Sequence, residues 1–108
     1  MSEKRFIDII PKITQWEGIE YVRDYQCPNG CSSICDTVTK PDLVGWCETP
    51  QGFMMVFECP ICFTRFRCHC NSGDKFDLDR FDYTLYQYVF SSSYVRNAKE
   101  IYARFENS

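Results

Sequence analysis

The chain has 108 residues, of which 44% are hydrophobic and 17% aromatic, and its formal net charge at pH 7 is −3. This composition excludes a disordered tail, and the acidic balance lacks the broad basic surface of a general nucleic-acid binder. The length indicates one domain spanning residues 1–108. Within it we distinguish an N-terminal helix and strand (1–26), a cysteine-rich core (27–70) and a C-terminal helical segment (71–108).

Eight cysteines in so short a chain indicate either a disulfide framework or a reduced, metal-binding protein. The apolar stretch at residues 6–13 is interrupted by Pro11 and is too short for the core of a signal peptide. No apolar run approaches the length needed to span a membrane. We therefore expect a cytoplasmic protein whose cysteines bind metal rather than form disulfides.

The N-terminal segment predicts two short helical pieces followed by a strand. Four apolar residues recur at helical spacing: Phe6, Ile10, Ile13 and Trp16. Because Pro11 removes a backbone donor, it divides this run, and we expect a helical piece on either side with the four side chains facing the core. Residues 19–26 are rich in β-forming side chains and predict a strand that leads into Cys27.

The middle of the chain contains two short turns that each carry a pair of cysteines. The turns are CPNGC at residues 27–31 and CPIC at residues 59–62. In each, Pro follows the first cysteine, and the spacing lets both sulfur atoms bind one metal ion. A tetrahedral metal needs four such ligands, and the two turns together supply them.

Three strands are predicted around these turns. Residues 43–48 and 53–58 form a hairpin with its turn at residues 49–52, where Thr, Pro, Gln and Gly are turn formers. Residues 63–70 form a third strand that returns antiparallel after the second turn.

A boundary at residues 71–74 separates this core from a segment without cysteine. Beyond it, apolar side chains repeat at helical spacing over residues 76–90 and again over residues 94–106, which predicts two helices. Residues 86–90 are aromatic and β-branched, so a strand there is the alternative. The predicted fold class is α+β, with a small antiparallel three-stranded sheet, an N-terminal helical segment and one or two C-terminal helices.

The order of turn, hairpin, turn and strand, together with the CPIC turn, resembles the zinc-ribbon fold group with its rubredoxin-type cysteine knuckles. The resemblance covers residues 27–70. It implies that Cys27, Cys31, Cys59 and Cys62 are the ligands of a structural zinc ion. The first turn has three residues between its cysteines instead of two, and Ser32 and Phe63 stand where this group usually has glycine.

Four cysteines remain outside this set: Cys35, Cys47, Cys68 and Cys70. They form a second metal site if the cysteine pairs interleave around two ions. Alternatively they are buried structural residues, since free cysteine behaves as a small apolar side chain. We expect one zinc ion, with two as the alternative. His69 lies on the strand face opposite Cys68 and Cys70, and we expect it at the surface rather than among the ligands.

Arg65, Arg67 and His69 alternate along the third predicted strand and should share one face. This row is a candidate nucleic-acid contact through Arg65 and Arg67. The competing interpretation, which we favour, is a solvated sheet face.

The sequence shows no nucleophile–base pair, phosphate-binding loop or paired carboxylates, so we do not expect an enzyme. The favoured hypothesis is a small intracellular zinc-ribbon protein that binds another macromolecule, with a protein partner favoured over a nucleic acid. A rubredoxin-like iron protein that transfers electrons is a third alternative, because iron and zinc both accept four thiolates. The oligomeric state does not follow from the sequence.

Overall fold

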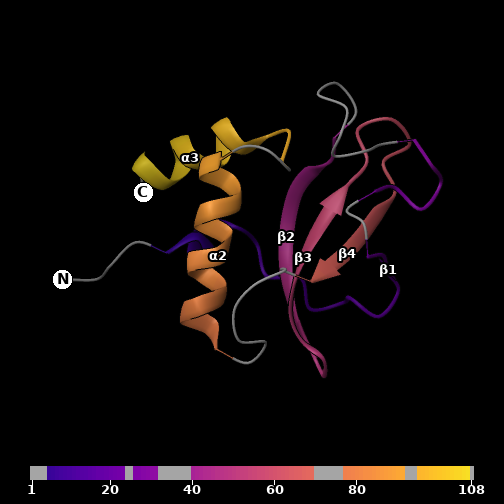
Figure 1. The fold of residues 1–108 in the computed structure, drawn as a ribbon, viewed down its shortest axis with the longest axis horizontal. Helices are drawn as coiled ribbons and strands as arrows, with labels where there is room; N and C mark the ends of the chain where they lie inside the picture. Colours follow the sequence, from indigo (N-terminus) through magenta and orange to yellow (C-terminus); the bar gives the residue numbers. More distant parts are fainter. Residues whose placement is uncertain (1–4, 24–25, 32–39, 70–76, 92–94, 108) are drawn as a thin grey trace.

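Helices pack against one face of a mixed β-sheet in this protein (Figure 1). A computed structural model of the chain describes residues 5–23, 26–31, 40–69, 77–91 and 95–107. The described helices are α1 (Phe6–Ile9), α2 (Leu78–Ser91) and α3 (Ala98–Asn107), and the strands are β1 (Glu20–Tyr21), β2 (Asp42–Thr49), β3 (Gly52–Glu58) and β4 (Arg65–His69). The predicted α+β class is therefore confirmed.

The sheet has four strands in the order β1-β4-β3-β2. β3 pairs antiparallel with both β2 and β4, as the hairpin and the returning strand predicted. β1, however, runs parallel to β4, with Glu20 opposite Phe66 and Tyr21 opposite Arg67. The prediction of a three-stranded, purely antiparallel sheet is thus replaced by a four-stranded mixed sheet.

The N-terminal segment differs from its prediction after Pro11. α1 ends at Ile9, and the following backbone pairs with the outer edge of β2 instead of entering a second helical piece. The Ile13 amide donates to the Trp46 carbonyl at 2.8 Å, and the Trp46 amide donates to the Pro11 carbonyl at 3.0 Å. The prediction of a second helical piece after Pro11 was therefore wrong, because the backbone of this segment bonds to the edge of β2 instead.

Strand register separates the sheet into two apolar faces. One cross-strand row, on the helix side, is Trp46, Met55 and Cys68, and the neighbouring row on the opposite face is Cys47, Met54 and His69. The first face joins the main core, to which α2 and α3 contribute Phe81, Leu85, Val89, Ala98 and Ile101. The second face builds a smaller cluster around Cys47, Met54 and Val56.

The smaller cluster is covered by residues 11–21, which we call the N-terminal arm. Ile13, Trp16 and Ile19 of the arm pack against it. Arg67 on β4 holds the arm in place: its Nε donates to the Ile19 carbonyl at 2.8 Å, and its guanidinium carbon lies 5.0 Å from the centre of the Trp16 ring. The arm therefore runs along the edge of β2, crosses the sheet and ends as β1 beside β4, so it shields both edges of the three-stranded unit.

Within the described ranges, no helix combines the length and the apolar character required to cross a bilayer.

The close approach of the arm to β2 gives a direct test of this arrangement. A Cβ at Gly45 would lie 2.5 Å from Ile13 Cδ1 and 2.9 Å from the Pro11 carbonyl oxygen. We expect Gly45→Ala to lower the free energy of unfolding by about 1–3 kcal/mol, because the arm must shift to admit the methyl group. Urea denaturation followed by tryptophan fluorescence measures this.

Gly18→Ala is the matched control, since no heavy atom lies within 4 Å of a Cβ built there. It should change the free energy of unfolding by no more than about 0.5 kcal/mol. Equal effects of the two substitutions would contradict the packing of the arm on β2.

Candidate metal centre

The turn at residues 59–62 connects β3 to β4 and carries two cysteines. Cys59 is buried and Cys62 half-buried. The Cys59 amide donates to the Thr64 carbonyl at 3.0 Å, and the Phe63 amide donates to the Cys59 carbonyl at 2.9 Å, which closes the turn. Phe63 has a φ of 62°, the left-handed conformation in which zinc-ribbon knuckles usually place glycine. Phe63 therefore adopts, as a residue other than glycine, a conformation that glycine takes without strain.

The turn at residues 27–31 is built in a similar way. The Gly30 amide donates to the Cys27 carbonyl at 2.9 Å, and Gly30 has a φ of 79°. Cys27 is buried and Cys31 half-buried, which repeats the order of exposure in the other turn. Each turn therefore presents one inner and one outer sulfur atom.

The two turns meet, and their four sulfur atoms form a cluster. The Sγ atoms of Cys27, Cys31, Cys59 and Cys62 all lie within 4.8 Å of one another. The Sγ atoms of Cys27 and Cys62 are 3.4 Å apart. Four thiolates around zinc at about 2.3 Å are separated by about 3.8 Å, so the observed spacings suit a tetrahedral metal. The structure thus brings together all four cysteines that the sequence suggested as ligands.

Backbone amides point at the inner sulfur atoms. The Asn29 amide donates to Cys27 Sγ and the Ile61 amide donates to Cys59 Sγ, both at 3.3 Å and both from the second residue after the cysteine. Such bonds stabilise thiolates and orient metal ligands. Their recurrence gives the inner sulfur atoms of the two turns the same backbone environment.

Two polar side chains next to the cluster were not recognised from the sequence. Asn29 Nδ2 donates to Thr64 Oγ1 at 3.1 Å and lies 3.6 Å from Cys62 Sγ. Thr64 Oγ1 is 3.3 Å from Cys62 Sγ, and its hydroxyl is the donor when that sulfur is a thiolate. Asn29 was visible only as a turn former, and Thr64 carried no signal, because its role depends on contact between distant turns.

These contacts give the two outer thiols, Cys62 and Cys31, opposite pKa shifts. Hydrogen bonds from the Thr64 hydroxyl, the Thr64 amide and the Asn29 side chain lower the pKa of Cys62 to about 5. The hydrogen bond with Cys62, together with burial, raises the pKa of Cys31 to about 11. The ligand set without a cation therefore does not ionise fully near neutral pH, and a metal that binds it must displace protons.

The predicted second metal site is not assembled by the described residues. Cys35 and Cys70 lie outside them. Cys47 and Cys68 are both fully buried, but they belong to rows on opposite faces of the sheet. They cannot ligate the same ion, and burial raises the pKa of Cys47 to about 11, as suits a structural thiol. Of the residues described, only the four-cysteine cluster groups three or more cysteine, histidine or acidic side chains for a metal.

Arg65 and Arg67, the candidate nucleic-acid contact, are both engaged by other groups of the chain. Both arginines and His69 share one face, as expected from the alternation. Arg67 is half-buried: it binds the arm, and its Nη1 lies 3.3 Å from Met54 Sδ. Arg65 Nε pairs with Glu58 Oε2 at 3.3 Å. His69 is half-buried, with its ring 5.4 Å from that of Tyr21.

No family model, curated protein or solved structure matches this chain. The local geometry of the two turns is therefore the basis for interpreting the site.

The contact between Thr64 and Cys62 predicts a measurable effect on metal binding. Thr64→Val keeps the shape of the side chain but removes the hydroxyl that faces the sulfur and accepts from Asn29. We expect it to weaken metal affinity by about tenfold, the lower end of the usual effect of losing a ligand's hydrogen-bond partner. Competition with a chromogenic chelator measures the affinity.

Thr14→Val serves as the control, since Thr14 is an exposed residue of the arm. It should leave the affinity unchanged. Equal affinities of the Thr64→Val and wild-type proteins would show that this hydroxyl does not support the site.

Proposed function

We propose that Cys27, Cys31, Cys59 and Cys62 bind one zinc ion and that this ion is structural. The observation that carries the proposal is the gathering of four sulfur atoms, from two turns about thirty residues apart, within 4.8 Å of one another. Four protein sulfur atoms complete a tetrahedral shell and leave no position for water or substrate. This donor set supports a role in folding rather than in catalysis.

The ion would join two parts of the chain that are distant in sequence. One is the turn that follows β1 and the other is the connection between β3 and β4. Structural zinc contributes about 10–16 kcal/mol of apparent binding free energy in small metal peptides, which is as large as the stability of a typical domain. The position of the first turn against the sheet then depends on the metal.

We further propose that this module binds another protein through the tip of the second turn. Ile61 is 55% exposed and Phe63 is 69% exposed, although both flank the ligand Cys62. Phe63 also adopts the left-handed backbone, which costs about 1–3 kcal/mol for a residue other than glycine. An exposed aromatic side chain held at such a cost suits an apolar contact with a partner.

The neighbouring charges support a protein partner over a nucleic acid. Arg67 is engaged with the arm and Arg65 with Glu58, so the cationic row offers few groups to phosphates. The net charge of −3 disfavours a polyanion as well.

Iron in the same four-sulfur site, for electron transfer, is the second alternative, since the ligands suit either metal.

Elemental analysis of the purified protein tests the metal proposal. We expect one zinc ion per chain, and Cys59→Ser should abolish stoichiometric binding and collapse the amide dispersion of the first turn and of β3 and β4. Cys47→Ser is the matched control, because both thiols are fully buried but only Cys59 belongs to the cluster. It should keep one ion per chain despite its cost in stability.

Three results would contradict parts of this proposal. Iron, with visible absorption, would favour electron transfer. Two ions per chain would contradict a single site. Unchanged amide dispersion after complete metal removal would exclude a structural role.

Substitutions at Phe63 test the interaction proposal, because they separate the strain of its backbone from the contact made by its ring. Phe63→Gly should be more stable than Phe63→Ala by about 1 kcal/mol, since both lack the ring but only glycine is free of the left-handed penalty. Both variants should keep zinc. Both should also lose a protein partner that the wild-type chain captures from cell extract.

Tyr83→Ser provides the control for the capture experiment, because Tyr83 is 63% exposed on α2 and distant in sequence from the second turn. It should retain the partner. Saturable binding of single-stranded RNA at low salt that Arg65→Ala abolishes would instead favour the nucleic-acid alternative.

A further inference from the structure

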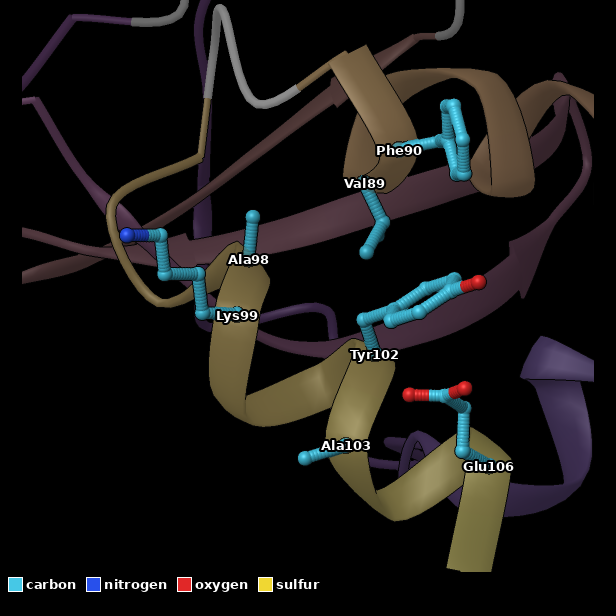
Figure 2. Close-up of a pocket in the computed structure, with 7 residues that line it drawn as sticks. All are labelled: Val89, Phe90, Ala98, Lys99, Tyr102, Ala103 and Glu106. Carbon is cyan, nitrogen blue, oxygen red and sulfur yellow. The ribbon is translucent and has the colours of Figure 1, made fainter.

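A groove of about 280 Å³ lies between α2 and α3, in the part of the chain that follows the cysteine core. Figure 2 shows its lining side chains, which come from the end of α2 and from successive turns of α3. The lining residues are Val89, Phe90, Ala98, Lys99, Tyr102, Ala103 and Glu106.

The inner surface of the groove is apolar and aromatic. Val89 and Ala98 are buried in its floor. Phe90 is 61% exposed, and its ring lies 5.7 Å from that of Tyr102 in an edge-on arrangement. A large aromatic side chain on a helix, exposed to this extent beside a hollow, provides apolar surface that a partner could remove from water.

The only charged residues of the lining stand at the two ends of a stripe on α3. Lys99, Ala103 and Glu106 occupy positions i, i+4 and i+7 of the helix, so they lie on one side of it. Lys99 and Glu106 are two turns apart, about 10 Å along the axis. All three are exposed, and the smallest is in the middle.

This stripe is complementary to itself when reversed. A two-fold axis near Ala103 places Lys99 of one copy opposite Glu106 of the other, and the same pair forms again at the other end. Two-fold interfaces require one surface to match its own rotated copy. Opposite charges on either side of an axis that passes between Tyr102 and Ala103 meet that requirement, and the small side chain of Ala103 allows the two helices to approach closely.

We propose that the α2–α3 groove is the surface through which two copies of this chain associate, with their α3 helices antiparallel. The ion pairs set the register, and the pairing covers Phe90 and Tyr102. This surface contains no cysteine of the metal cluster. It therefore does not depend on the proposed function of the second turn. An amphipathic helix from a different protein could also fill the groove, but it would not require the self-matching charge order.

Sedimentation equilibrium of the full chain, purified with its metal, tests the proposal. The wild-type protein should show a reversible monomer–dimer equilibrium between micromolar and millimolar concentration. Lys99→Glu and Glu106→Lys should each weaken dimerisation by about tenfold or more, because two attractive pairs become repulsive at once.

Mixing the variants gives the decisive result. In an equimolar mixture of Lys99→Glu and Glu106→Lys chains, both cross-pairs become attractive, so a heterodimer should form about as tightly as the wild-type dimer. The double variant Lys99→Glu/Glu106→Lys should also dimerise with itself. Ala103→Arg should block every one of these dimers, because it puts a long side chain at the axis.

Matched controls carry the same charge changes on other sides of α3. Arg104→Glu corresponds to Lys99→Glu and Glu100→Lys to Glu106→Lys, and both positions are exposed. Circular dichroism confirms that each variant keeps its helices. A wild-type chain that is monomeric throughout overturns the proposal, as does a mixture that fails to restore the dimer. Dimers disrupted equally by the controls would also overturn it. Binding of a foreign helix by a monomeric wild-type chain would assign the groove to a different partner.

Discussion

Four sulfur atoms within 4.8 Å of one another impose an electrostatic constraint on the rest of the fold. Ionised thiolates at these separations would repel one another, and the hydrogen bond with Cys62, together with burial, already raises the pKa of Cys31 to about 11. A divalent cation would convert this repulsion into attraction and complete the four-sulfur shell. We therefore expect the meeting of the first turn with the connection between β3 and β4 to be most stable when a cation or bound protons neutralise that charge.

The far face of the sheet is held by a different interaction. There the N-terminal arm, rather than a second layer of helices, covers the apolar cluster around Cys47. Arg67 joins arm and sheet, because its guanidinium binds the Ile19 carbonyl and lies over Trp16. A residue that sequence reasoning assigned to a solvated or nucleic-acid-binding face is thus part of the packing. A long apolar stem with a charged head suits this position, since it fills space and satisfies a backbone carbonyl together.

Local signals in the sequence were sufficient for much of the fold and for the set of four clustered cysteines. The two cysteine turns, the hairpin and the periodic helices are each specified by residues close together in the chain. The course of the arm and the pairing of β1 with β4 were not predictable in this way, because the partners, Trp46 and β4, lie more than thirty residues downstream. The placement of Cys47 and Cys68, two of the four cysteines considered for a second site, could not be predicted for a related reason. Which face each cysteine occupies depends on the register across β3, and a shift of one residue reverses it.

The exposed turn at residues 59–62 connects the two parts of the proposed function. Phe63 holds a left-handed backbone that a glycine would adopt without strain. Two backbone bonds close the turn around it, from Cys59 to Thr64 and from Phe63 to Cys59. Chelation of Cys59 and Cys62 by one metal would restrain the same backbone from the other side. A structural metal would then do more than join distant segments: by over-determining the turn, it would let the chain present an aromatic side chain that an unrestrained loop would turn away from water.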